Sequence, residues 1–262
     1  HTWLPDVHAQ GPAPISALLS GVLLKCAMLA LFRYYAIAAQ ATGMEFVQSV
    51  MVISGLITLF VGGIFLIRQH DVKRMFAYHS IVHMGVIAFA LGVGGPFGLF
   101  AAIFHRLAHS FTKALAFCST GNIARIYGHK DMSKMGGMVK IAPITTIMFG
   151  AAVCSLVGVP AFAIFVSEYN VFVGAITSGQ YIAVALFAIA LAVIFIADFA
   201  HFNMASFGEP KGVVVHNKEM SLLENLPLIA LCALIIIFGV WHVDSFYTLV
   251  GNGVNIMMGA LK

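Results

Sequence analysis

The sequence predicts an all-α membrane protein, a bundle of about seven transmembrane helices. Its 262 residues include only 14 basic and 10 acidic side chains, 61% of the residues are hydrophobic, and the mean hydropathy is +0.97. Soluble domains carry about 25% charged residues. The net charge of +4 is too small and too dispersed to form a nucleic-acid-binding surface. The composition therefore excludes a water-soluble enzyme and a nucleic-acid partner, and it makes lipid the solvent of the chain.

Seven apolar runs are long enough to cross a bilayer, which takes about 20 residues per helix. None of them alternates with a period of two, so the strands of a membrane barrel are not expected. A weaker run over residues 245–261 contains Asn252 and Asn255, and it is expected either to span the membrane or to lie at its interface. The seven runs cover residues 15–38, 46–67, 72–93, 97–121, 141–177, 180–206 and 222–241.

Two of the seven runs are expected to be broken helices. Residues 141–177 are too many for one straight span, and they contain Gly158 and Pro160, where proline removes a backbone donor. Residues 97–121 carry a polarity that a lipid-facing helix would not tolerate. Irregular backbone occurs at membrane depth where it lines a cavity or packs against protein. The polar residues of this run are His105, Arg106, His109 and Lys113.

Lysine and arginine gather in alternate loops, and this pattern predicts the orientation of the bundle. The loops after the second, fourth and sixth runs are basic, whereas the turns around residues 94–96 and 178–179 carry no lysine or arginine. Because basic loops face the cytoplasm, the odd-numbered runs are expected to cross outwards. The N-terminus is then inside and the C-terminus outside.

Ionisable side chains recur within the apolar runs, although a charge at the bilayer centre costs about 2.5–3.5 kcal/mol. Both signs of charge occur, and histidine titrates near neutral pH, so such groups can pass protons by alternating protonation. His105, His109 and Lys113 are spaced i, i+4 and i+8 and share one helical face. The predicted proton relay consists of Lys25, His83, His105, His109, Lys113 and Glu168. Further candidates for the relay are His79, Asp198 and His201.

Plainer interpretations of these residues stay open. His79 or His201 would only satisfy a carbonyl of a neighbouring helix, Asp198 would be solvated near the cytoplasmic end of its run, and Lys113 would pair with a structural carboxylate. A metal bound by histidines spaced i, i+4 is disfavoured because no carboxylate or cysteine completes the site. Four cysteines lie singly in separate runs and are interpreted as small buried hydrophobic residues. They are Cys26, Cys118, Cys154 and Cys232.

The chain opens on a polar, proline-bearing segment, residues 1–8, without the basic region and apolar core of a signal peptide. We interpret the chain as a C-terminal piece of something longer. Its motifs resemble those of the antiporter-like membrane subunits of respiratory complex I, which are related to subunits of energy-converting hydrogenases and of multisubunit sodium/proton antiporters. The motifs that carry this resemblance are residues 1–8, 11–25, 71–85, 109–115, 134–137 and 158–168.

Within this superfamily, residues 164–168 and 207–210 are most similar to the hydrogenase-4 component F branch. The resemblance implies a single membrane domain over residues 1–262, cut from a fold of fourteen core helices with two inverted five-helix repeats. Residues 1–38 would end the first repeat, residues 44–206 would form the whole second repeat, and residues 207–262 would hold a closing helix and tail. The missing first half would lie outside this chain or be supplied by a second polypeptide.

The resemblance also implies roles for individual residues. Lys25 is similar to the central lysine that links two half-channels, and Glu168 to the terminal acid of the second broken helix. His83 matches a polar relay position, and His79 stands where relatives more often carry serine. The run 105–113, with His105, His109 and Lys113, is similar to the relay of the second half-channel.

The function implied by the resemblance is that of a proton-translocating membrane subunit in a redox-driven pump, not catalytic by itself. No cofactor is expected in this chain, and iron–sulfur clusters with flavin or nickel–iron are expected in partner subunits. The expected surroundings are other membrane subunits, peripheral redox subunits and lipid, in a bacterial or archaeal cytoplasmic membrane. Two alternatives remain: a subunit of a cation/proton antiporter without a redox partner, and a structural membrane anchor with a degenerate relay.

Overall fold

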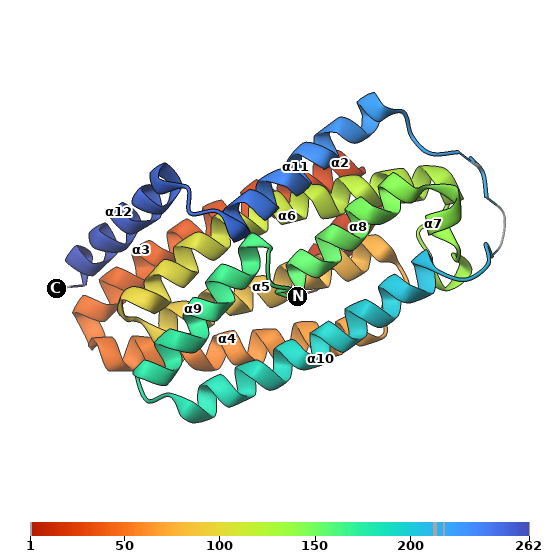
Figure 1. Ribbon diagram of the computed structural model, residues 1–262. Coiled ribbons are helices and arrows are strands. Elements are labelled where there is room, and N and C mark those ends of the chain that lie inside the picture. Colours follow the sequence, from red (N-terminus) through yellow and green to blue (C-terminus); the bar gives the residue numbers. More distant parts are fainter. Residues whose placement is uncertain (1, 212–213, 217, 262) are drawn as a thin grey trace.

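The computed structural model describes residues 2–211, 214–216 and 218–261, and nearly all of them are helical (Figure 1). Within these residues no β-strand forms, and a single isolated bridge joins Asp71 to Asp131. The first helices are α1 (Trp3–Gln10), α2 (Ala13–Leu18), the π-helical turn η1 (Leu19–Leu23), α3 (Leu24–Thr42), α4 (Met44–Ile67), α5 (Val72–Val93) and α6 (Gly95–Tyr127). They are followed by η2 (Met132–Lys134), α7 (Met138–Ile141), α8 (Pro143–Leu156), α9 (Ala163–Thr177), α10 (Tyr181–Ser206), α11 (Leu222–Val240) and α12 (Asp244–Ala260).

The predicted helical membrane bundle is confirmed. In the part of the chain that the structure describes, five helices are long and apolar enough to span a bilayer: Ala13–Thr42, Met44–Ile67, Val72–Val93, Tyr181–Ser206 and Leu222–Val240. The 33-residue helix α6 is about 50 Å long at 1.5 Å per residue, and the pair α8–α9 completes the set. The long helices run in roughly the same direction in Figure 1.

Helix α5 forms the centre of the bundle. In its most apolar stretch 94% of the residues are buried, against 28% in α4 and 33% in α10. It packs against α4, α6, α1 and α9, so it exposes almost no side chain outside the bundle. Polar side chains on α5 therefore face protein on every side and not lipid.

The break in the fifth run is confirmed, and the break in the fourth is not. Helices α8 and α9 are separated by residues 157–162, where Gly158 has a φ of +70° and Ala161 a φ of +87°. Helix α6, in contrast, runs unbroken through His105, His109 and Lys113. The prediction was wrong because these side chains are fully buried against neighbouring helices, and a polar face that meets protein does not require irregular backbone.

The first run contains a feature that the sequence did not indicate. Helices α2 and α3 are joined through the π-helical turn η1 into one span over residues 13–42. A π turn widens the helix locally and leaves carbonyls free for other donors, and such turns are frequent at functional sites. Here the carbonyl of Ser20 accepts a hydrogen bond from Nζ of Lys25, at 3.0 Å.

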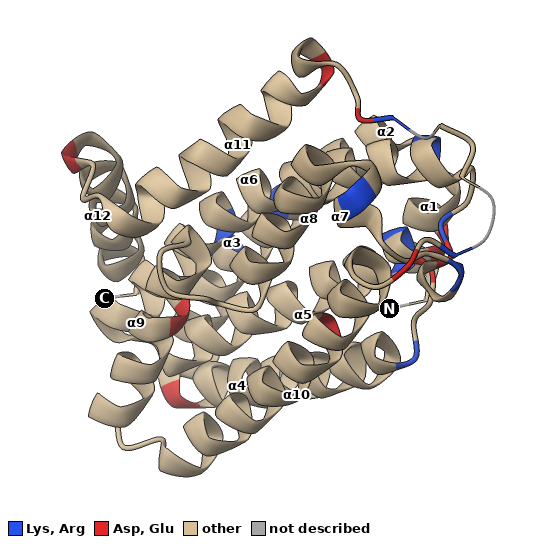
Figure 2. Cartoon of the chain, turned by 45° about the vertical axis from the view of Figure 1, so that its right-hand side comes forward, with Lys and Arg blue, Asp and Glu red and all other residues tan. Residues whose placement is uncertain are grey.

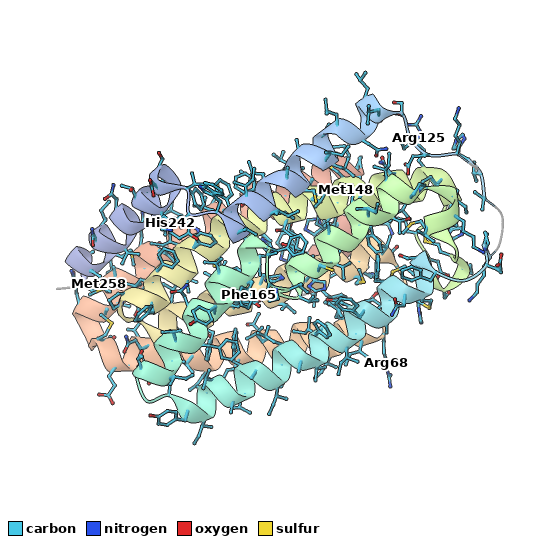
Figure 3. The ribbon with its side chains drawn as sticks, in the orientation of Figure 1. Arg68, Arg125, Met148, Phe165, His242 and Met258 are labelled. Atoms are coloured by element: carbon cyan, nitrogen blue, oxygen red, sulfur yellow. The ribbon has the colours of Figure 1, made fainter. Side chains whose placement is uncertain are left out.

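One end of the bundle carries most of the basic side chains. Figure 2 shows lysine and arginine gathered beside α1 and α7, and Arg68 and Arg125 lie at this end in Figure 3, opposite His242 and Met258. This is the end that the sequence predicts to face the cytoplasm. Asp71 caps α5 there by accepting hydrogen bonds from the backbone of Lys73 and Arg74.

The loop before α11 closes the same end. The carboxylate of Glu219 accepts hydrogen bonds from the backbone of Ile144 and Thr145 at the start of α8. Burial raises the pKa of Glu219, but hydrogen bonds from Thr145, Met220 and Asn225 outweigh this effect and hold the pKa below its usual value. The charged carboxylate therefore stabilises the N-terminus of α8, where a negative charge is favoured.

The four cysteines are all free thiols, and they are not equally buried. Cys232 is buried, and Cys118 and Cys154 are half-buried. The prediction that all four are buried was wrong for Cys26, which is exposed on α3. Periodicity alone does not show which face of a uniformly apolar helix turns outwards, and α3 is apolar around most of its circumference.

Candidate functional site

A row of buried ionisable groups in contact with one another crosses the middle of the bundle, and His83 on α5 stands at its centre. Nδ1 of His83 and Nε2 of His105, on α6, share a hydrogen bond of 2.9 Å. The ring centroid of His83 also lies 4.9 Å from that of His109 and 5.8 Å from that of His79. All four imidazoles are buried. Three side chains from two helices thus converge on one histidine.

Lys25 joins this group from α3. Its Nζ contacts Nδ1 of His109 and donates to the carbonyl of Ser20, and the lysine is buried. Arg106 holds the same turn by donating to the carbonyl of Lys25 at 3.1 Å, and its guanidinium lies over the ring of Phe32. Because an ammonium group only donates, Nδ1 of His109 is the acceptor, and the neutral ring carries its proton on Nε2.

On the other side, His105 leads to the broken helix. Its Nδ1 shares a hydrogen bond of 2.8 Å with Oγ of Ser167 on α9, and Ser167 donates its single hydroxyl proton to the carbonyl of Ile164 at 2.6 Å. Nδ1 of His105 is therefore the donor to Ser167. It follows that Nε2 of His105 is the acceptor and Nδ1 of His83 the donor in the hydrogen bond between the two rings, as assigned from this network.

Glu168 follows Ser167 on α9, and its side chain reaches back into the helix break. Oε2 of Glu168 lies against the α-carbon of Gly158, where an added Cβ would overlap it. Oε1 is buried and makes no hydrogen bond to the described residues. Only glycine offers both the positive φ and the open space that this carboxylate occupies. The break in the fifth run thus provides the space that the Glu168 side chain occupies.

These contacts define a set of residues that we call the relay row. All its members are buried. The assigned donors between His83, His105 and Ser167 lead toward Ser167, and Glu168 is the next residue of α9. Nε2 of His83 and Nε2 of His109 make no hydrogen bond to the described residues, so at this junction His109 has a proton without an acceptor and His83 has an acceptor without a donor. The relay row is Lys25, His109, His83, His105, Ser167 and Glu168.

Lys113 shares the helical face predicted for it but lies beside the relay row. It is fully buried, and its Nζ donates to the carbonyl of Phe76 at 2.5 Å. Its ammonium group lies over the rings of Phe76 and Phe117, 5.6 and 5.7 Å from their centroids, which is the geometry of a cation–π interaction. The i, i+4, i+8 pattern placed the three residues on one face correctly, but His83 lies between the other two rings, with a hydrogen bond to His105 and a ring contact with His109.

The three further candidates form a branch between α5 and α10. Nε2 of His79 lies 2.6 Å from Oδ2 of Asp198, and both side chains are buried. His201 is one turn further along α10 and bonds the carbonyl of Ala197 through Nδ1. His201 thus contacts a carbonyl of its own helix and not one of a neighbouring helix, and Asp198 is buried and not solvated.

Sequence reasoning missed Ser167 and the positioning role of Arg106. Ser167 directly precedes Glu168, and a hydroxyl next to the acid of a broken helix is a signal that could have drawn attention to it. Arg106 lies three residues before His109, which contacts Lys25, and it donates to the carbonyl of Lys25. Within the described residues no cluster of three or more histidine, cysteine or acidic side chains could hold a metal ion.

Comparison with known proteins identifies the family of this chain. The family described as "NADH:quinone oxidoreductase/Mrp antiporter, TM" matches residues 1–194. The chain belongs to this family. A "Hydrogenase-4 component F homolog" from Methylacidiphilum infernorum is 35% identical over 214 residues, which are 81% of this chain and 44% of that protein. A Na⁺/H⁺ antiporter protein of Alkalihalophilus pseudofirmus is 32% identical over 244 residues, 90% of this chain and 48% of that protein.

The fold of this antiporter-family chain is also found in a solved structure. A chain of respiratory complex I from Thermus thermophilus matches with a TM-score of 0.88 and 21% identity, covering all of this chain and 55% of that one. The chain spans about half the length of the relatives it matches. The resemblance to antiporter-like subunits and the all-helical membrane fold are thereby confirmed.

Proposed function

We propose that this chain is a proton-translocating membrane subunit of a redox-driven ion pump of the complex I or hydrogenase type. The observation that supports the proposal most strongly is the relay row, which links Lys25 to the acid of the broken helix through three buried imidazoles. A row of this kind has no structural purpose that apolar packing would not serve at lower cost, because each buried charge in a membrane is expensive. The similarity to the hydrogenase-4 component F homolog favours the redox class.

Proton transfer along the relay row follows from the assigned hydrogen bonds. Lys25 gives a proton to Nδ1 of His109, and His109 releases its Nε2 proton toward Nε2 of His83. The imidazolium of His83 then passes its Nδ1 proton to Nε2 of His105. Each ring accepts on one nitrogen and releases from the other, and it returns to its starting tautomer before the next proton.

The last steps bring the proton to Glu168. Nδ1 of His105 donates to the hydroxyl of Ser167, and that hydroxyl releases its own proton toward the neighbouring carboxylate. The carboxylate lies at the break between α8 and α9, where irregular backbone is tolerated only against protein or water. Glu168 is therefore the residue from which protons leave the relay row.

The driving force is electrostatic. Moving one proton outwards against 100 mV costs about 2.3 kcal/mol, and charge pairs near a protein surface interact by a few kcal/mol. A change of charge in a neighbouring subunit next to Lys25 is thus sufficient to push the proton onto His109. Lys113 lies beside this path, and a positive charge on its side chain would bias the imidazoles toward passing protons on.

The proposal includes partners and location. Peripheral redox subunits would hold the iron–sulfur clusters with flavin or nickel–iron, and further membrane subunits would complete the half-channels that residues 1–38 and 44–206 only partly form. The complex would lie in a bacterial or archaeal cytoplasmic membrane. The basic end of the bundle would face the cytoplasm, and proton release from Glu168 would face outwards.

The proposal is tested by purifying the chain with its native partners from membranes in a mild detergent. A redox-driven pump would yield co-purifying subunits that show iron–sulfur signals in electron paramagnetic resonance. A complex that lacks redox centres but exchanges Na⁺ for H⁺ in vesicles would support the antiporter alternative, which the similarity to the A. pseudofirmus antiporter protein favours. A redox complex that turns over without moving protons would leave only the structural anchor.

A further inference from the structure

The pair of His79 and Asp198 has no place in the relay row. Its two side chains come from α5 and α10, they are 1% and 0% exposed, and Nε2 of His79 lies 2.6 Å from Oδ2 of Asp198. A carboxylate buried this deeply is costly and is usually paired or functional. The pair therefore calls for an explanation of its own.

The ring of His79 connects the pair to the centre of the relay row. His79 and His83 lie one turn apart on α5, and their rings are stacked with centroids 5.8 Å apart and planes 23° apart. Nδ1 of His79 and Nε2 of His83 are both buried and make no hydrogen bond to the described residues. Nε2 of His83 is also the atom left free toward His109 by the assigned tautomers. A proton on Nδ1 of His79 thus has an acceptor in Nε2 of His83. We call His83, the residue at the centre of the relay row, the hub.

The other side of the pair leads toward the basic end of the bundle. Oδ1 of Asp198 makes no hydrogen bond to the described residues. His201 lies three residues further along α10, so its side chain is on the same helical face, and it is 6% exposed. Its Nδ1 is bound to the carbonyl of Ala197, which leaves Nε2 to exchange a proton. Helix α10 ends at Ser206, whose buried hydroxyl oxygen also has no partner among the described residues.

We propose that His201, Asp198 and His79 form a second proton input to His83, which opens at the cytoplasmic end of α10. The inference rests on the proposed function, because it supplies protons to the same hub. The relay row then has two inputs, one from Lys25 on α3 and one from α10, and a single output through His105. Lys25 would deliver the charge change that drives transfer, and the α10 branch would reload the hub from the cytoplasm.

The proton count along the branch balances. Nε2 of His201 takes a proton from the cytoplasmic side and gives it to the carboxylate of Asp198. The protonated carboxyl group then donates to Nε2 of His79, and Nδ1 of His79 releases its proton toward Nε2 of His83. The ring of His79 returns to the tautomer with its proton on Nδ1 before the next transfer. Asp198 is left as a carboxylate, and no bond other than those to hydrogen is formed or broken.

A purely structural pair is the competing explanation. Lys113 interacts electrostatically with both Asp198 and His79, so Asp198 would then do no more than balance its charge. Such a role requires a negative charge but no proton exchange. It also gives no part to His201, which is one turn away on the side that leads to the cytoplasm.

The test uses the intact complex in inverted vesicles and measures the membrane potential generated in turnover with a potential-sensitive dye. Asp198→Asn keeps the size of the side chain but does not accept a proton at neutral pH, so we expect the potential to form at least about tenfold more slowly, the scale of a lost acid–base group. Asp198→Glu should recover much of the rate. His201→Ala should also be slow, and imidazole added to the cytoplasmic side should restore it.

The imidazole rescue separates proton transfer from packing, because a structural role of His201 would not respond to a diffusible base. Glu168→Gln is the matched control and should fail with or without imidazole. If Asp198→Asn and His201→Ala pump normally while Glu168→Gln fails, the second input is rejected and the proposed function stands. If His201→Ala is slow but imidazole has no effect, the α10 branch is structural. If all three variants pump normally, the proposed function itself is wrong.

Discussion

Nδ1 of His83 and Nε2 of His105 share a hydrogen bond of 2.9 Å that links the most buried helix of the bundle to the longest one. The bond connects the part of the relay row that would supply protons to the part that would release them. On one side lie Lys25 and His109, and on the other Ser167 and Glu168. A row without this contact would leave the lysine and the glutamate as separate buried charges.

Lys25→Ala should lower the number of protons pumped per electron at least about tenfold while the complex still assembles. Removing the ammonium group relieves the cost of a buried charge but takes away the donor to His109, and positioned acid–base groups contribute factors of about 10² or more. Reconstituted vesicles with a pH-sensitive dye provide the measurement. Lys134→Ala, which removes a lysine that is 72% exposed, is the control, and equal pumping by both variants would remove Lys25 from the row.

Lys113→Arg should keep most of the native pumping, whereas Lys113→Ala should lose most of it. Arginine stays protonated and stacks on aromatic rings, so it preserves the positive charge between Phe76 and Phe117 without exchanging a proton. Alanine removes the charge and one of the donors to the carbonyl of Phe76, which also accepts from Oγ of Ser80. Native electrophoresis checks assembly of both variants. If the arginine variant assembles but pumps as poorly as the alanine variant, Lys113 itself carries protons.

Glu168→Gln should assemble and pump poorly, and Glu168→Asp should be intermediate. Glutamine matches the shape of the side chain but does not release a proton, while aspartate keeps the acid on a shorter reach that water can bridge. The measurement is the pumping rate across neutral pH, where histidines titrate. Native pumping by the glutamine variant would make Glu168 a structural acid and place the exit elsewhere.

Gly158→Ala should reduce both stability and pumping, and Gly179→Ala should reduce stability alone. Both glycines have positive φ, +70° and +74°, so each alanine costs about 1–2 kcal/mol in backbone strain. At Gly158 the added Cβ also displaces the carboxylate of Glu168, whereas nothing lies within 4 Å at Gly179. Thermal unfolding in detergent and vesicle pumping give the two readouts. Equal pumping by the two variants would show that the position of the Glu168 carboxylate does not affect proton transfer.

The bundle could be predicted from the sequence because every helix that crosses lipid must be apolar and about 20 residues long. Apolar length identifies the spans, the basic loops predict their direction, and the Gly158–Pro160 signal locates the break. The supposed break near His105 was wrong for a physical reason: the sequence shows that a helix is polar but not which neighbour covers its polar face. The π turn before Lys25 lacks any sequence signal that differs from ordinary helix.

The residues of the site could be predicted better than their connections. Helical periodicity places His105, His109 and Lys113 on one face, yet hydrogen bonds between helices depend on how α5 and α6 pack. That packing makes His83 the link between His105 and His109, and it turns Lys113 toward Phe76. The position of Ser167 next to Glu168 is a sequence signal, but its contact with His105 depends on how α6 and α9 pack.

The decisive measurement for the relay row is the number of protons pumped per electron by a complex that carries His83→Gln. Every path to Glu168 passes through this imidazole, and glutamine fills similar space but does not bind and release a proton at neutral pH. His242→Gln is the control. His242 is 65% exposed and lies at the end of the bundle opposite to the basic end (Figure 3). We expect His83→Gln to lose pumping at least about tenfold while the control is unaffected. An assembled His83→Gln complex that pumps as well as the native complex would refute the role of His83 as the hub of proton transfer.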